Sequence, residues 1–306
     1  LKVLLLCYNR ALSNQLYRAV KDMGFPDGRV WANSFHGLCS WAHRQLHGSD
    51  ARLPVPDNPD AKRIFFRENA YKSVLDAVER GVLPRFDAIV VDEGQDFFDE
   101  WWLVLDELHR PDGPKGLYVF YDPGQAIFDH GCEVPVAPTI QFPTNFRNTK
   151  VLAEVINRLG EVDSIPHLRA PKGDEPLWNT VSSHRKLARG MAQRIQDLVR
   201  QGVAPDRIVV LTVHSQRNSP LAGITALGEH PLVPLKERQK GAVTHATIGG
   251  FKGLEADVVF CVEEDQTDPL VCRALRYVAA SRSKHLFYLY SQENWLSTSP
   301  LAAAPA

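Results

Sequence analysis

The 306-residue sequence lacks the features that mark membrane proteins, disulfide-stabilised proteins and strongly basic nucleic-acid-binding proteins. No apolar run is long enough to span a bilayer, so no membrane partner is expected. The five cysteines are odd in number and show no C-x-x-C spacing, which favours reduced thiols in a cytoplasmic protein over a disulfide framework or a zinc site. The formal net charge is −1, so any nucleic-acid-binding site must be a local patch.

The composition is that of an ordinary globular protein, with 44% hydrophobic and 23% charged residues, and the length fits one large domain or two ordinary ones. Short apolar runs alternate with amphipathic segments, which predicts an α/β fold with parallel sheets. We expect a first domain over residues 1–137, a second over 138–296 and a disordered tail over 297–306.

The periodicity and the turn residues also predict the individual elements. The expected strands are 3–7, 30–32, 88–92, 117–121, 139–142, 207–212, 258–263 and 285–290, with one more inside 241–248; the run at 117–121 is expected to be buried. The expected helices are 11–23, 38–46, 61–80, one ending at 109, one opening at 144–149 and running to 159, 184–201 and 273–283, and the expected loops are 47–60 and 160–180.

The apolar strand at 88–92 ends in two adjacent carboxylates, Asp92 and Glu93. A buried parallel strand that ends this way places acids at the carboxyl edge of the sheet, where ligands bind. Buried charge requires a partner, and a metal ion with phosphates is a common one. The pair therefore suggests a Mg²⁺ ligand and a base that orients water for attack on a phosphoryl group. An acidic loop after a core strand is the alternative.

Further polar clusters follow the other expected strands. Along the chain they are Asn9-Arg10, Ser34-Phe35-His36-Gly37, Asp92-Glu93-Gly94-Gln95, Asp122-Pro123-Gly124-Gln125, Asn145-Phe146-Arg147, the segment from Thr247 to Glu255, and the segment from Tyr277 to Arg282. In this order the series resembles motifs Ia, Ib, II, III, IV, V and VI of the UvrD/Rep-like superfamily I DNA helicases. The likeness extends over nearly the whole chain.

The resemblance implies two RecA-like parallel-sheet domains, the first truncated at its N-terminus, with ATP and Mg²⁺ between them. Its catalytic residues would be Asp92 on Mg²⁺, Glu93 on the attacking water, Gln95 and Gln125 as sensors of the γ-phosphate, and Arg147 and Arg282 as arginine fingers. The nucleotide would also meet Gly253 and Glu255, the latter at the ribose. The single-strand track would comprise Asn9, Phe35, His36, Thr247 and Lys252. These roles imply a DNA-dependent ATPase or helicase with single-stranded DNA, or RNA, as its partner.

Several of these residues also have purely structural interpretations. Arg147 could cap or pair on a helix, and Arg282 could be one more solvated charge. Gln95 and Gln125 could be hydrogen-bonded loop amides. An aromatic pair such as Phe35-His36 is more often core packing than a base-stacking surface. Base stacking combined with local cations is what sequence-neutral single-strand binding requires.

One family feature is missing. A P-loop needs G-x-x-x-x-G-K-[ST], and no Gly-Lys-Ser or Gly-Lys-Thr occurs in the sequence. In the family this loop precedes motif Ia, so the sequence resembles a fragment cut after the P-loop, and we expect little or no ATPase activity from it alone. A nuclease or other domain upstream on the same chain is expected. The alternative is a catalytically degenerate helicase-like module that binds single strands or a protein partner.

Overall fold

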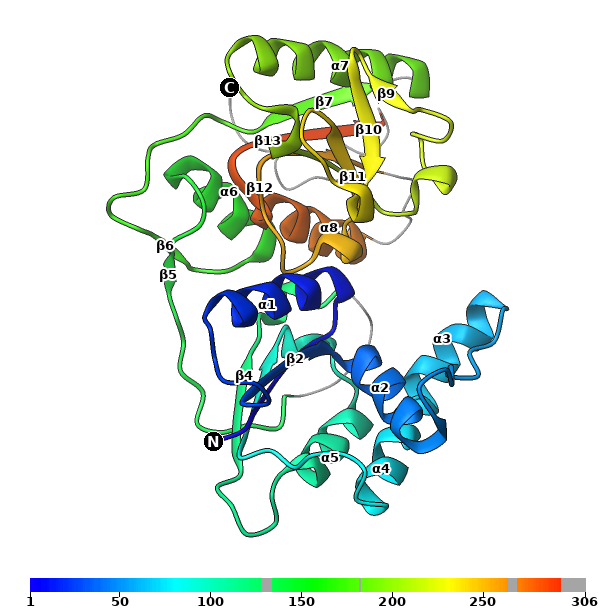
Figure 1. Cartoon of the computed structure of the whole chain (residues 1–306). Helices are drawn as coiled ribbons and strands as arrows, with labels where there is room; N and C mark the ends of the chain where they lie inside the picture. The colour runs from blue at the N-terminus through cyan, green and yellow to red at the C-terminus, as the bar shows by residue number, and fades with distance from the viewer. Residues whose placement is uncertain (128–133, 182, 264–268, 293–306) are drawn as a thin grey trace. The chain divides into compact units, whose positions relative to one another are not determined.

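The computed structural model describes residues 1–127, 134–181, 183–263 and 269–292 (Figure 1). The chain divides into two compact units, Leu1–Ile140 and a second that begins at Gln141. Both are mixed α/β units built on mainly parallel sheets, which confirms the predicted fold class.

The first unit has a four-stranded parallel sheet in the order β2-β1-β3-β4. Its elements are β1 (Val3–Cys7), α1 (Arg10–Asp22), β2 (Val30–Ser34), α2 (Phe35–His47), α3 (Pro59–Glu68), α4 (Lys72–Glu79), β3 (Ala88–Asp92), α5 (Asp99–Leu108) and β4 (Gly116–Phe120). The helices α2, α4 and α5 pack on one face of the sheet and α1 lies against β1 and β2. The aromatic centre of the core is Trp101, fully buried, whose ring stacks on Phe35 at 3.9 Å between centroids.

The second unit has a seven-stranded sheet in the order β7-β13-β12-β8-β11-β10-β9, parallel except for β9. Its elements are β5 (Thr144–Asn145), α6 (Lys150–Gly160), β6 (Ile165–Pro166), β7 (Leu177–Val181), α7 (His184–Arg200), β8 (Ile208–Thr212), β9 (Ala226–Leu227), β10 (His230–Pro234), β11 (Val243–Thr247), β12 (Ala256–Val262), α8 (Pro269–Ser281) and β13 (Ser283–Gln292). One sheet face packs on α7, while α6 and α8 lie together on the other (Figure 1). The central strands are buried on both faces, which explains their continuous apolar sequences.

Several predicted elements differ from the observed ones. The predicted helix 61–80 is two helices, α3 and α4, because α3 ends at Glu68 and the next residue, Asn69, has a non-helical φ of −126°. The predicted strand 139–142 is wrong: the described strand there is the two-residue β5, which pairs with β6. The predicted loop 160–180 contains β6 and β7, and β9 and β10 were not predicted at all. The predicted tail 297–306 lies outside the described residues.

Strand β4 exists as predicted, but it is not buried. It is an edge strand in the described part of the first sheet, and Leu117 and Val119 alone face the core. On the opposite face, Tyr118 is 61% exposed and Phe120 is 54% exposed. An apolar run therefore identified the strand, but it did not show that the strand lies at an edge.

No helix in the described part of the chain combines the length and the apolar character needed to cross a membrane.

Candidate functional site

The first group of predicted site residues lies at the carboxyl edge of the first sheet. Parallel pairing in register places Cys7, Asp92 and Phe120 side by side where β1, β3 and β4 end. Directly after β3, Glu93 has a left-handed backbone with φ 57° and ψ 46°. This conformation is uncommon for a residue other than glycine and is often found at functional turns. The Asp92 carboxylate accepts a hydrogen bond from the Glu93 amide at 3.0 Å, which supports the turn.

The turns after β3 and β4 are joined by side-chain hydrogen bonds. Gln95 is 7% exposed, and its Nε2 donates to Glu93 Oε2 at 2.7 Å while its Oε1 accepts from the Asp122 amide at 3.1 Å. Gln125 Nε2 in turn donates to Asp122 Oδ2 at 2.7 Å. The chain Glu93–Gln95–Asp122–Gln125 therefore fixes the orientation of the Glu93 carboxylate. We call these four residues the carboxylate network.

Electrostatics at this edge favour a cation. Burial raises the pKa of the Cys7 thiol, and the nearby negative charges of Asp92 and Glu93 raise it further. Burial also raises the pKa of Tyr8 to about 12, with a contribution from Asp96. Negative charge thus accumulates where the strands end.

The residues present fit a Mg²⁺ ion that is only partly coordinated by protein. Among the described residues there is no group of three or more His, Cys, Asp or Glu side chains placed to hold a metal. Mg²⁺ is commonly bound by one or two carboxylates together with waters and substrate phosphates. Asp92 could serve as such a single carboxylate ligand, and the ion would then bring charge neutralisation and phosphate binding to this edge.

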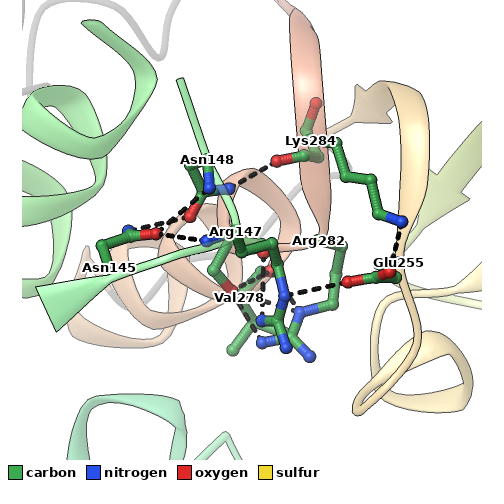
Figure 2. Close-up of polar contacts among 9 residues, drawn as sticks. Asn145, Arg147, Asn148, Glu255, Val278, Arg282 and Lys284 are labelled. Atoms are coloured by element: carbon green, nitrogen blue, oxygen red, sulfur yellow. Dashed lines mark hydrogen bonds and ion pairs between the residues drawn. The ribbon is translucent and has the colours of Figure 1, made fainter. Parts of the chain in front are cut away.

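The second group lies in the second unit, around Glu255 (Figure 2). Arg147 Nε donates to Glu255 Oε2 at 3.2 Å, and Lys284 forms an ion pair with Glu255 Oε1. Burial on its own would raise the pKa of Glu255, but the hydrogen bonds and charges of Lys284 and Arg147 outweigh it and lower the pKa. Glu255 is therefore an anion held between two cations.

The backbone around Arg147 is organised by two asparagines. Asn145 Oδ1 accepts hydrogen bonds from the amides of Arg147 and Asn148 at 3.0 and 3.1 Å, and its Nδ2 donates to Asn148 Oδ1 at 2.8 Å. Asn148 also donates to the Ser283 carbonyl at the start of β13. The turn before α6 is thereby attached to β13, which positions the Arg147 side chain.

Arg282 lies beside Arg147. It is 1% exposed, and its guanidinium donates to the Val278 carbonyl at 3.3 Å and to Ser281 Oγ at 2.9 Å. Arg147 donates to the carbonyl of the same Ser281 at 3.5 Å, so the two guanidinium groups lie side by side (Figure 2). Arg282 is therefore not one more solvated charge, and two adjacent cations form a site that an anion would stabilise.

The residues predicted to contact nucleic acid are divided between the two units. Asn9 caps α1, its Oδ1 accepting from the Ala11 amide at 2.7 Å. Phe35 is fully buried and has no ring surface for a base, so the structure favours core packing for it. The His36 ring packs against Trp101 and Phe66, and burial lowers its pKa to about 4.

The remaining predicted contacts lie between β11 and β12 in the second unit. Thr247 Oγ1 accepts from the Gly250 amide at 2.9 Å, which closes the turn after β11. Lys252 is 1% exposed and so presents no cation at the surface. Gly253 has φ +79°, a conformation that favours glycine and lets the chain reach Glu255.

Sequence reasoning missed two features of the second unit. Phe146 is 75% exposed beside Arg147, and its ring packs on His167 at 4.7 Å between centroids. Lys284 was assigned no role, although it pairs with Glu255. The only sequence signal for Phe146 was its place next to Arg147; for Lys284 there was none, because its partner lies far away in the chain.

Comparisons with known proteins place helicase sequence in the second unit. Residues 243–290 match the family model of the UvrD-like helicase C-terminal domain. A solved structure of the C-terminal domain of a possible DNA helicase from Lactobacillus plantarum WCFS1 is similar at 18% identity and a TM-score of 0.40, covering 52% of this chain and 92% of that chain. A comparison with curated proteins finds no match. The family match over this segment confirms the resemblance to UvrD/Rep-like helicases.

Proposed function

We propose that this chain is the motor core of an ATP-dependent helicase or translocase that hydrolyses ATP to move on single-stranded DNA. ATP would bind with Mg²⁺ on Asp92, and Glu93 would orient and deprotonate the attacking water. Arg147 and Arg282 would stabilise charge that develops on the transferred phosphoryl group.

The observation that carries the proposal is the carboxylate network. Glu93 lies at the end of a parallel strand, in a left-handed turn, and its carboxylate is fixed by Gln95. Gln95 is joined through Asp122 to Gln125, so a ligand that moves one turn would also move the other. A general base must be held within hydrogen-bond reach of its water, and such an arrangement would supply that orientation. Gln95 would then be a positioning residue for Glu93.

The pair Arg147 and Arg282 supports the same function from the second unit. Two guanidinium groups bonded to one serine are matched to an oxyanion, because each offers several donors in a fixed plane. In GTPases a single arginine finger contributes about 10³–10⁵ in rate. A gain of that size would make turnover depend on Arg147 and Arg282.

The alternative function is a catalytically degenerate module that binds single-stranded nucleic acid or a protein partner. It is favoured by the lack of a P-loop sequence in residues 1–306. Without a P-loop, these residues would bind the β- and γ-phosphates weakly. We therefore expect little turnover from this chain by itself.

The test is ATP hydrolysis in the presence of Mg²⁺, with and without single-stranded DNA, by the native protein that contains these residues. DNA-stimulated turnover that is lost in Glu93→Gln and in Arg147→Gln, but kept in the exposed Arg158→Gln control, would support the motor. If the native protein binds single-stranded DNA but shows no turnover, the binding module is the better description.

A further inference from the structure

The second unit has a pocket of about 270 Å³ beside the N-terminus of α6. Its lining includes Phe146, Arg147, Thr149, Arg169, Lys284 and His285, and none of the described lining residues is acidic. Its volume is slightly below the roughly 300–1,000 Å³ typical of pockets for drug-sized ligands. Both the charge and the size thus fit a small anion better than an apolar or a large ligand.

Two observations show that the charge of this pocket is only partly neutralised. Arg147 and Lys284, which both line the pocket, share the single carboxylate of Glu255. Arg169, by contrast, pairs with no acidic side chain within 4.0 Å among the described residues. Three permanent cations are therefore balanced by one anion, which leaves an excess of two positive charges.

Two features of the α6 N-terminus add to this preference. The helix runs from Lys150 to Gly160, and the positive end of its dipole lies at the pocket. Thr149, 3% exposed, lines the pocket, and its Oγ1 has no hydrogen-bond partner among the described residues. A buried hydroxyl without a partner is costly and could donate to an anion.

We propose that this pocket binds a phosphoryl group, with Arg169 and Lys284 as its anchors and Arg147 as a shared contact. An incoming phosphoryl group would compete with Glu255 for Lys284 and Arg147, so Glu255 would act as a resting counter-ion that the ligand displaces. The inference deepens the proposed function, because it would give the second unit its own phosphate site using Arg169, a residue outside the predicted motifs.

Inorganic pyrophosphate is the probe, because it has neither base nor ribose and isolates the phosphoryl contacts. Binding to the full chain is measured by calorimetry at low ionic strength. Arg169→Gln should weaken binding about fivefold, since it removes a charge-assisted hydrogen bond at an exposed position. Glu255→Gln should strengthen binding about threefold, since it removes the competing carboxylate. Arg158→Gln, on α6 but outside the pocket, should leave pyrophosphate binding unchanged.

Arg169→Gln and Glu255→Gln are expected to change the affinity for pyrophosphate in opposite directions, which a general loss of structure would not do. The inference fails if the native chain shows no saturable binding, if Arg169→Gln behaves like Arg158→Gln, or if Glu255→Gln weakens binding. Displacement of pyrophosphate by ATP would identify a nucleotide as the source of the group, and displacement by a short oligodeoxynucleotide would identify a nucleic-acid backbone; displacement by neither would overturn the proposal. Pyrophosphate binding by the chain, together with no ATP hydrolysis by the native protein that contains it, would refute the motor and support the pocket.

Discussion

The carboxylate network can be tested by replacing Gln95 with an acid of the same shape. In Gln95→Glu the Nε2 donor, 2.7 Å from Glu93 Oε2, becomes an oxygen. With both groups ionised at that distance and an effective dielectric constant of about 20, their repulsion would be about 6 kcal/mol. Taking up one proton is cheaper: a carboxyl with an ordinary pKa near 4.3 is protonated at pH 7 for about 4 kcal/mol.

The destabilisation of Gln95→Glu should therefore be about 4 kcal/mol at pH 7 and should depend on pH. Once protonated, the introduced carboxyl can donate to Glu93 much as the amide does, so the cost should fall to about 1 kcal/mol at pH 5, since each pH unit is worth about 1.4 kcal/mol. The free energy of unfolding is measured with urea at both pH values, using the fluorescence of the chain's tryptophans.

Two further variants complete the experiment. Gln95→Met removes the donor without adding charge, so it should cost about 1–3 kcal/mol at both pH values. Gln15→Glu, on the exposed surface of α1, should be nearly neutral. The described contact between Gln95 and Glu93 would be refuted if Gln95→Glu lost less than about 1 kcal/mol of unfolding free energy at pH 7, or if this loss did not become smaller at pH 5.

Two other predictions concern buried charge in the second unit. Burial lowers the pKa of His245 to about 4, so the unfolded state takes up a proton at a higher pH than the folded state does. The free energy of unfolding should therefore fall as the pH drops from about 6.5 to 4. In His245→Gln, the difference in unfolding free energy between pH 7.5 and pH 5.5 should be smaller by roughly 1 kcal/mol. Glu263 and Arg276 form an ion pair in which both side chains are 7% exposed. Glu263→Gln should cost about 3–5 kcal/mol in urea unfolding because it leaves Arg276 uncompensated, and Glu263→Gln with Arg276→Met should recover much of that loss.

The sequence was sufficient to predict the central strands of both sheets. Strands β3 and β8 are continuous runs of branched apolar residues bounded by polar turns, and such a run has few alternatives in an α/β protein. Strands β9 and β10 were missed because both are short and β10 contains prolines. They are stabilised by pairing, β9 with β10 and β10 with β11, rather than by their own composition. Local patterns cannot report such non-local pairing.

The candidate site was predictable in its residues but not in its contacts. Asp92 and Glu93 could be identified from the sequence, because two acids directly after a buried strand are costly unless their charge is paired. The hydrogen bond from Gln95 to Glu93 depends on the left-handed turn at Glu93, and the bond to the Asp122 amide depends on the pairing of β3 with β4. The resemblance assigned Gln95 the role of a γ-phosphate sensor, which stays a prediction. The structure shows its amide hydrogen-bonded to Glu93 and to the Asp122 amide.

In the second unit, the residue predicted to contact the nucleotide, Glu255, lies away from the residue predicted to contact nucleic acid, Thr247, because the strands of the sheet run parallel. Thr247 ends β11, whereas Glu255 directly precedes β12, and both strands run parallel to β8. The two residues therefore lie at opposite edges of one sheet, joined by a single segment that is anchored by the fully buried Phe251. If Glu255 meets a nucleotide and Thr247 meets a nucleic acid, the two ligands need not compete for one surface. Residues 248–254 would then be the covalent connection between the two sites in the proposed motor.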